Sequence, residues 1–292
     1  MLKTLILSFV LLLTLGGCSK NSIFPTDTKV YGSPQEHDYR YEEHFFSSSQ
    51  AALLHGWMFR SKGPSRGLIV VTNGMRYNMS ERFKKWTWVL EEGYDLFIYD
   101  YRGYGGSVGE VDMFGFVDDV TAAITYSHQL APTLSMVLVG QSMGGSFVID
   151  AVAKSDYPYV RLLIIDSTMI GFAKAADALI KKHFLLWPLI WVPDAITPKG
   201  VDAIDFVDKT KTATLFVVGQ SDSVIPPEHS LELYIKAEEP KALWIVENAE
   251  HVECLCSPEV RADLKKVLEE VLKEEYGLIE GISYYRSQKS LR

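Results

Sequence analysis

Two serines of this 292-residue chain lie in Gly-x-Ser-x-Gly motifs, a pattern that can present a serine hydroxyl as a nucleophile. Ser142 directly follows the apolar run Met136–Val139 and directly precedes an apolar segment of helix length. In that strand-turn-helix context the glycines permit a strained turn, and the helix N-terminus faces developing negative charge. Ser107 lies in a glycine-rich loop several residues past its strand, with no helix beginning at the next residue. We therefore predict Ser142 as the nucleophile.

A serine nucleophile needs a general base, and the chain has seven histidines. In the chain order serine, acid, histidine, which accompanies this type of turn, only His229 and His251 follow both Ser142 and a later strand-end acid. His229 falls at a helix start. His251 follows the last apolar strand, at the edge where α/β sheets place their sites. The position predicts His251 as the base.

Two carboxylates are candidates for the group that orients the imidazole. Asp222 follows the strand Leu215–Val218, and Asp166 ends the strand Leu162–Ile165. Either could hold a buried imidazole in the required tautomer. Asp222 precedes His251 by one helix and one strand, so both reach adjacent loops. We favour Asp222, while Asp166 also fits a turn residue at a strand end.

An oxyanion formed at Ser142 needs two backbone N–H donors. Met143, the residue after the nucleophile, is expected to supply one. The other is expected from the loop after the strand Leu68–Thr72, where Asn73-Gly74-Met75 stands. We predict Met75 as the second donor, with Gly74 as the alternative.

Parallel strands must bring these residues to one edge of a sheet. Two short runs around 41–46 and 52–59 suggest an antiparallel start. The apolar runs that follow are continuous, as in strands covered on both faces: Leu68–Thr72, Asp95–Tyr99, Met136–Val139, Leu162–Ile165, Leu215–Val218 and Leu243–Val246. Between them lie segments of helix length: Ser80–Glu91, Met113–Gln129, Met143–Lys154, Pro227–Ala237 and Pro258–Lys273. This alternation predicts an α/β fold, a mainly parallel sheet with helices on both faces.

The stretch from Ser167 to Thr212 is too long for an ordinary connection between two strands, so we predict an inserted lid at about 168–211. Its centre is apolar and aromatic. Trp187 and Trp191 are candidate substrate contacts that would favour medium acyl chains over acetyl. The alternative is that both tryptophans pack the lid's own core.

The N-terminus has the pattern of a secretory signal, with Lys3, an apolar run and then small residues. The apolar run is too short to span a bilayer comfortably. Leu15-Gly16-Gly17-Cys18 resembles the bacterial lipobox, which implies cleavage before Cys18 and its acylation; a plain signal with an incidental cysteine is the alternative. Ser19 resembles the sorting residue of outer-membrane lipoproteins. We expect a signal over 1–17, an acylated tether over 18–38, the folded domain over 39–276 and a polar tail over 277–292.

Composition excludes several classes. The formal net charge is −8 and the pI about 5.4, which disfavours binding to nucleic acid. Cys18, Cys254 and Cys256 are too few for a disulfide framework, and no Cys-x-x-Cys with partner histidines suggests zinc. We predict no metal.

The motifs resemble those of the α/β-hydrolase superfamily of serine hydrolases. The resemblance rests on 140–145 (GQSMGG), on the acid loop ending Val224-Ile225-Pro226, and on 100–107 (DYRGYGGS), which is similar to a D-x-R-G-x-G-x-S loop of bacterial hydrolases. It makes Ser107 part of a structural loop. A departure is Asn73, where the family usually has histidine before the glycine. The resemblance implies an eight-stranded sheet and acyl transfer to water without metal or cofactor.

The resulting expectation is a membrane-anchored serine hydrolase of the bacterial cell envelope that cleaves carboxylic esters or thioesters. It would lie at the periplasmic face, on the outer membrane if the host has two membranes, and act on a small-molecule or lipid acyl ester. The alternatives are a serine peptidase, or a non-catalytic surface lipoprotein that uses the same fold as a binding module.

Overall fold

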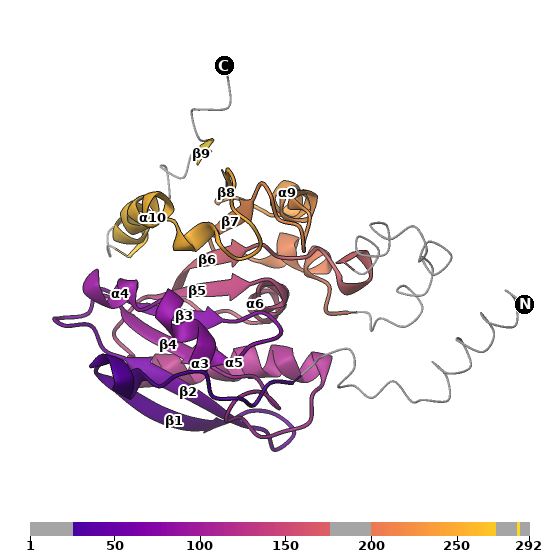
Figure 1. Cartoon of the computed structure of the whole chain (residues 1–292). Coiled ribbons are helices and arrows are strands. Elements are labelled where there is room, and N and C mark those ends of the chain that lie inside the picture. Colours follow the sequence, from indigo (N-terminus) through magenta and orange to yellow (C-terminus); the bar gives the residue numbers. More distant parts are fainter. Residues whose placement is uncertain (1–25, 176–199, 273–284, 287–292) are drawn as a thin grey trace, which may run out of the picture.

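A single mixed sheet organises the protein. The computed structural model describes residues 26–175, 200–272 and 285–286. Within these ranges the strand order is β1-β2-β4-β3-β5-β6-β7-β8-β9. β2 is antiparallel to both β1 and β4, and every other neighbouring pair is parallel (Figure 1). The predicted α/β class, with a mostly parallel sheet of about eight strands, is confirmed; β9 adds two residues beyond β8.

The elements alternate along the chain as expected for such a sheet. The strands are β1 Tyr41–Ser47, β2 Leu53–Phe59, β3 Leu68–Thr72, β4 Asp95–Tyr99, β5 Met136–Gln141, β6 Val160–Asp166, β7 Thr214–Gly219, β8 Lys241–Val246 and β9 Tyr285–Arg286. The helices are η1 Pro34–His37, α3 Met79–Arg82, η2 Phe83–Lys85, α4 Trp88–Glu91, α5 Met113–Leu130, α6 Met143–Lys154, η4 Ala203–Asp205, η5 Val207–Lys209, α9 Pro227–Lys236, η6 Cys254–Cys256 and α10 Pro258–Val271.

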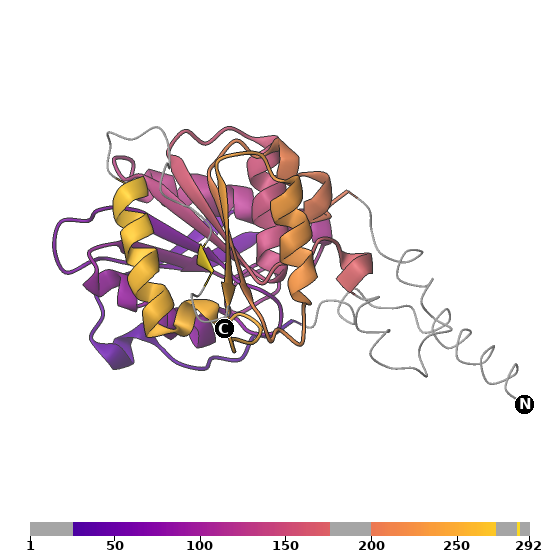
Figure 2. The ribbon, with the colours of Figure 1, turned by 90° about the horizontal axis from the view of Figure 1, so that it is seen from above.

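Helices cover both faces of the sheet, and a separate apolar core lies under each layer. One core includes Phe116 of α5, Phe147 of α6 and Leu233 of α9. The other includes Val89 of α4 and Leu264 of α10. Figure 2 shows α10 on one side of the strands and α6 with α9 on the other. Coverage on both sides explains why β3 to β7 are continuously apolar instead of alternating.

The predicted helix Ser80–Glu91 is broken into three short pieces, α3, η2 and α4. Its buried residues include Phe83, Trp86 and Leu90, which keep the three- and four-residue spacing of a helix with one face on the sheet. The segment therefore buries the face that the sequence predicts, although a 3₁₀ turn divides it into separate pieces.

Contacts with the domain begin ahead of residue 39, where the sequence places the end of the tether. The carbonyl oxygen of Asp27 accepts a hydrogen bond from the N–H of Gly105, at 2.8 Å. The N–H of Tyr31 donates to Oγ of Ser80, at 3.0 Å. Residues 27–31 therefore lie against the loops that follow β3 and β4.

The two described ends of the predicted lid insertion lie side by side. The N–H of Ile204 donates to the carbonyl of Ile170, and the N–H of Phe172 donates to Oδ1 of Asp202, both at 3.0 Å. Residues 176–199, which include Trp187 and Trp191, lie outside the described part of the chain, so the lid remains a prediction.

Cys18 and the predicted signal also lie outside the described residues, as does the predicted C-terminal tail apart from β9. Among the helices that the structure describes, none is both long and apolar enough to cross a bilayer.

A buried ion pair holds the loop after β4 to α5. Arg102 is 1% exposed, and its Nη2 donates to Oδ1 of the fully buried Asp119, at 2.7 Å. Nε of Arg102 lies 3.1 Å from both carboxylate oxygens, and the backbone N–H of Arg102 donates to Oδ2, at 3.0 Å. Removal of one member would leave an uncompensated charge in the core.

We expect Asp119→Ala to lower the free energy of unfolding by about 3–5 kcal/mol, the usual cost of a broken buried pair. Denaturant unfolding followed by circular dichroism measures this change. Asp118→Ala is the matched control, because Asp118 is the exposed neighbour on α5 and should change stability by less than about 1 kcal/mol. Equal losses in the two variants would contradict the assigned role of the pair.

Candidate active site

Ser142 stands at the turn between β5 and α6, with φ 54° and ψ −122°. A positive φ is rare for a residue with a side chain and is typical of strain kept for a purpose. The surrounding glycines make the turn possible: a Cβ added to Gly144 would lie 2.5 Å from the carbonyl oxygens of Thr72 and Asn73. The N–H of Ser142 donates to the carbonyl of Asp166, at 2.8 Å, which ties the turn to β6.

The structure brings Ser142, His251 and Asp222 into one hydrogen-bonded chain. Nε2 of His251 lies 3.0 Å from Oγ of Ser142, and Nδ1 of His251 lies 2.8 Å from Oδ2 of Asp222. The other oxygen of Asp222, Oδ1, accepts from the N–H groups of Val224 and Ile225, at 2.9 and 2.8 Å. The carboxylate is therefore fixed on one side by backbone donors and meets the imidazole on the other.

Close packing of two loops places the acid beside the histidine. A Cβ on Gly219, the last residue of β7, would lie 2.3 Å from the carbonyl oxygen of Ala249. The N–H of Ser221 donates to that same carbonyl, at 3.0 Å. Parallel pairing of β7 with β8 thus brings the Asp222 loop and the His251 loop together at the carboxyl edge of the sheet.

Two segments next to Ser142 carry the predicted oxyanion donors, the start of α6 and the loop after β3. Met143 begins α6, and its N–H is one of those that a helix N-terminus leaves without an intrahelical partner. On the other side, a Cβ added to Gly74 would lie 2.9 Å from Cβ of Ser142. The loop after β3 therefore reaches the nucleophile, with Gly74 in close contact and Met75 next along the chain.

Asn73, which departs from the usual histidine of the motif, is a buried polar residue of this loop. It is 4% exposed, and neither its side-chain oxygen nor its side-chain nitrogen has a hydrogen-bond partner among the described residues. An unsatisfied buried polar group costs about 1–3 kcal/mol. The departure from histidine in the motif therefore coincides with a side chain that lacks a hydrogen-bond partner among the described residues.

Asp166, the alternative acid, lies close to the loop that carries His251. Its carboxylate is fully buried and accepts from Nε2 of Gln141, at 2.9 Å, and from Oγ of Ser167, at 3.2 Å. Oγ of Ser167 also accepts from the N–H of Val252, the neighbour of His251, at 3.2 Å. Burial raises the pKa of Asp166 to about 6. Asp166 therefore connects to the histidine loop through Ser167, while the imidazole itself is bonded to Asp222.

The hydroxyl of Ser107 donates one hydrogen bond and accepts another, and both partners are backbone groups. Its Oγ donates to the carbonyl of Asp100, at 2.7 Å, and accepts from the N–H of His55, at 2.8 Å. These bonds join the loop after β4 to β2. The position is that of a structural residue, as the motif comparison implied.

His229, the alternative base, is buried at the base of the insertion. Its Nδ1 accepts from the N–H of Ile170, at 3.2 Å, and burial lowers the pKa of its imidazole. It holds the start of the insertion in place and does not take the position beside Ser142 that His251 occupies.

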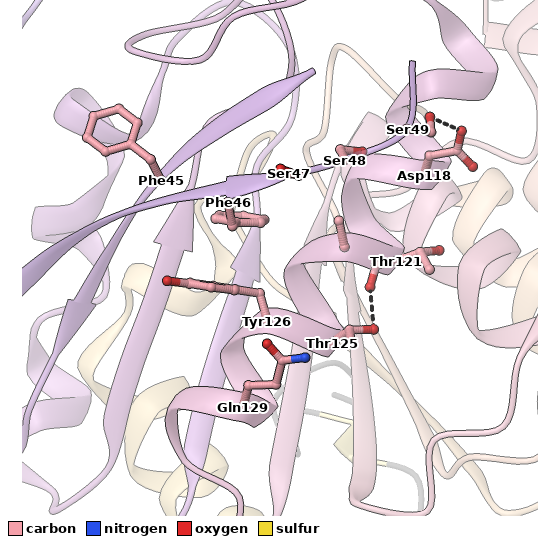
Figure 3. A pocket seen from close by; sticks show the side chains of 11 residues that line it. Phe45, Phe46, Ser47, Ser48, Ser49, Asp118, Thr121, Thr125, Tyr126 and Gln129 are labelled. Atoms are coloured by element: carbon pink, nitrogen blue, oxygen red, sulfur yellow. Dashed lines mark hydrogen bonds between the residues drawn. The ribbon is translucent and has the colours of Figure 1, made fainter. Parts of the chain in front are cut away.

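A groove of about 650 Å³ lies elsewhere on the molecule, between the edge strand β1 and α5. Phe46 and Tyr126 lie along it, and Oγ of Ser49 donates to Asp118 at one end (Figure 3). None of the predicted site residues lines this groove. Within the described ranges, no cluster of three histidine, cysteine or acidic side chains is arranged to hold a metal ion.

Comparisons with known proteins match large parts of the chain. The family model described as "Serine aminopeptidase, S33" matches residues 63–202. The protein YfhR of Escherichia coli is 29% identical over 241 residues, which cover 80% of each chain. WAV2 of Arabidopsis thaliana, described as an alpha/beta hydrolase domain-containing protein, is 26% identical over 227 residues, with 74% of this chain and 73% of WAV2 covered.

A solved structure has the same fold. The esterase Pf2001 of Pyrococcus furiosus superposes with a TM-score of 0.68 and 18% identity, covering 85% of this chain and all of the esterase. At that identity the likeness speaks for the fold. The chain is therefore similar over part of its length to a hydrolase family and to an alpha/beta hydrolase domain-containing protein, and it shares the fold of an esterase.

Proposed function

We propose that this protein is a serine hydrolase that cleaves carboxylic esters or thioesters through an acyl-enzyme on Ser142. The observation that carries the proposal is the continuous chain of hydrogen bonds from Oγ of Ser142 through His251 to Asp222. Nucleophile, base and orienting acid are the groups that such chemistry needs, in the order that proton transfer requires. The Pyrococcus neighbour is itself described as an esterase, which agrees with this reaction class.

In the proposed reaction Oγ of Ser142 attacks the acyl carbon and its proton passes to Nε2 of His251. The oxyanion is held by the N–H of Met143 and by a second donor from the loop after β3, Met75 or Gly74. The carbon–oxygen or carbon–sulfur bond then breaks, and His251 gives the proton to the leaving group. Water attacks the acyl-enzyme with His251 as base, which releases the carboxylic acid and restores Ser142.

Labelling by a fluorophosphonate tests this function, because the probe reacts with an activated serine. We expect one covalent adduct per chain, located by mass spectrometry on the peptide that carries Ser142, and no adduct in His251→Ala. A folded protein that resists the probe would favour the alternative, a non-catalytic surface lipoprotein that uses the fold to bind.

A serine peptidase is the second candidate, favoured by the description of the matching family as a serine aminopeptidase. Parallel assays with a nitrophenyl ester and an aminoacyl nitroanilide separate the two. Higher kcat/KM on the ester supports the proposal, and higher kcat/KM on the nitroanilide supports the peptidase. Trp187 and Trp191 stay predicted contacts for the acyl chain of an ester substrate.

The proposal also places the enzyme on a membrane of the bacterial envelope, through an acylated Cys18. We expect Cys18→Ser to move the protein from the membrane fraction to the soluble fraction, because the acyl chains that supply stable anchoring are lost. Fractionation with immunoblotting measures the change, and Cys256→Ser serves as the control for removal of an exposed cysteine. A mature N-terminus without acyl mass at Cys18 would refute the anchor.

A further inference from the structure

The chain just after the predicted anchor is held on the domain by its backbone. Nδ2 of Asn78 donates to the carbonyls of Asp27 and Lys29, at 3.0 and 2.7 Å. The N–H of Gly105 donates to the same Asp27 carbonyl, and the N–H of Tyr31 donates to Oγ of Ser80. Asn78 is 2% exposed, and its Oδ1 accepts from the N–H of Ser80, so its amide is fully engaged. This attachment fixes where the chain leaves the domain.

Exposed aromatic and aliphatic side chains gather at this attachment. Val30 is 76% exposed, Tyr31 39% and Tyr77 41%. The rings of Tyr31 and Tyr77 pack edge to face, with centroids 5.7 Å apart. Nζ of Lys29 lies 4.9 Å from the Tyr31 ring centre, and the guanidinium of Arg82 lies 4.9 Å from that of Tyr77. Two tyrosines flanked by cations thus face solvent together.

Lysine and arginine outnumber the two acidic side chains, Asp27 and Glu81, in the same area, although the whole chain carries −8. Arg82 is paired with Glu81, at 3.1 Å. Lys29, Arg76 and Lys84 are exposed, and among the described residues none of the three forms an ion pair. We call the seven residues of this area the basic–aromatic surface: Lys29, Val30, Tyr31, Arg76, Tyr77, Arg82 and Lys84.

The basic–aromatic surface adjoins the candidate active site. Arg76 and Tyr77 belong to the loop after β3, whose Gly74 lies against Ser142. The indigo chain in Figure 1 passes α3, in agreement with the hydrogen bond from the N–H of Tyr31 to Oγ of Ser80. Residues 19–26 separate Cys18 from the docked Asp27, and at most ~3.6 Å per residue gives that stretch a reach of about 30 Å. An anchor at Cys18 therefore holds this surface close to the bilayer.

We propose that the basic–aromatic surface lies on the headgroups of an anionic lipid bilayer and turns the catalytic edge toward the membrane. Tyrosine rings are favoured at the level of the headgroups, and lysine and arginine near an anionic surface are attracted to it. The proposal rests on the proposed function only for the anchor at Cys18. With the catalytic edge facing the membrane, an acyl ester held in the bilayer has only a short distance to cover to reach Ser142.

Depth-dependent quenching tests the contact without use of the hydrolytic activity. The full chain with Cys256→Ser, which removes the exposed thiol, is reconstituted in vesicles of phosphatidylcholine with phosphatidylglycerol. A fluorophore is attached at Thr28→Cys, beside the surface, or at Thr133→Cys in the loop before β5, at the opposite edge of the sheet. Lipids with a nitroxide near the headgroup serve as quenchers.

We expect the Thr28 probe to lose most of its emission and the Thr133 probe to keep its own. Lys29→Glu should reduce quenching at Thr28, and Lys211→Glu, an exposed lysine just before β7 at that opposite edge, should not. Equal quenching of the two probes, or no quenching of the Thr28 probe, overturns the proposal. A protein that stays in solution shows no quenching at Thr28 and so also overturns it. Quenching at Thr28 in a protein that hydrolyses no ester would count against the proposed function alone.

Discussion

Ser142→Ala should lower kcat for a short-chain nitrophenyl ester by on the order of 10⁶-fold, the loss seen when a serine nucleophile is removed from an intact chain of nucleophile, base and acid. The methyl group that replaces the hydroxyl has no oxygen to attack the acyl carbon. His251 then has no proton to accept, so the imidazole contributes nothing further. Steady-state kinetics, with circular dichroism to check folding, measure the effect.

Ser107→Ala is the matched control, because Ser107 lies in the second Gly-x-Ser-x-Gly motif. Its hydroxyl is bonded to the backbone of Asp100 and His55. The variant should keep most of its kcat and lose about 1–3 kcal/mol of stability, since two buried backbone groups lose their partner. Similar losses of kcat in the two variants, with both folded, would remove the basis for choosing Ser142.

Much of the fold could be predicted because its strands are apolar on both faces. Leu68–Thr72 and Asp95–Tyr99 have the bounds that the apolar runs predict, since polar or turn residues stand at each end. The helix that begins at Met143 is also as predicted. The prediction of one helix over 80–91 was wrong, because a 3₁₀ turn at Phe83–Lys85 divides the segment, and the buried positions alone do not distinguish a continuous helix from a divided one.

The candidate site shows a different limit. Ser142, Asp222 and His251 each follow a strand, so local sequence is enough to place them at one edge, and the structure puts them within hydrogen-bond distance. The contact from Ser167 to the N–H of Val252 joins residues far apart in the chain through a backbone group. The docking of residues 27–31 on Asn78 is also made through carbonyls. A contact made through a backbone group does not depend on the residue type at that position. From the sequence alone, the polar segment that contains residues 27–31 was therefore interpreted as a tether without contacts to the domain.

The choice between the two acids can be decided by Asp222→Asn and Asp166→Asn. We expect Asp166→Asn to keep most of the turnover. Burial raises the pKa of Asp166 to about 6. The stability gained from its neutral form is present at low pH and is lost as pH rises through about 6. Asp166 makes no hydrogen bond to the imidazole and is linked to the loop of His251 through Ser167, so its replacement leaves the bond between Asp222 and His251 in place.

Asp222→Asn should lower kcat/KM by about 10⁴-fold, because the amide forces the imidazole into the wrong tautomer. The N–H groups of Val224 and Ile225 need an acceptor, so the amide oxygen takes the place of Oδ1. The NH₂ group then occupies the place of Oδ2, 2.8 Å from Nδ1 of His251. It can only donate, so Nδ1 must be unprotonated and the proton moves to Nε2, where it faces Ser142. An imidazole in that form cannot accept the serine proton. Initial rates at pH 7 to 8 measure both variants, and a larger loss in Asp166→Asn would transfer the orienting role to the end of β6.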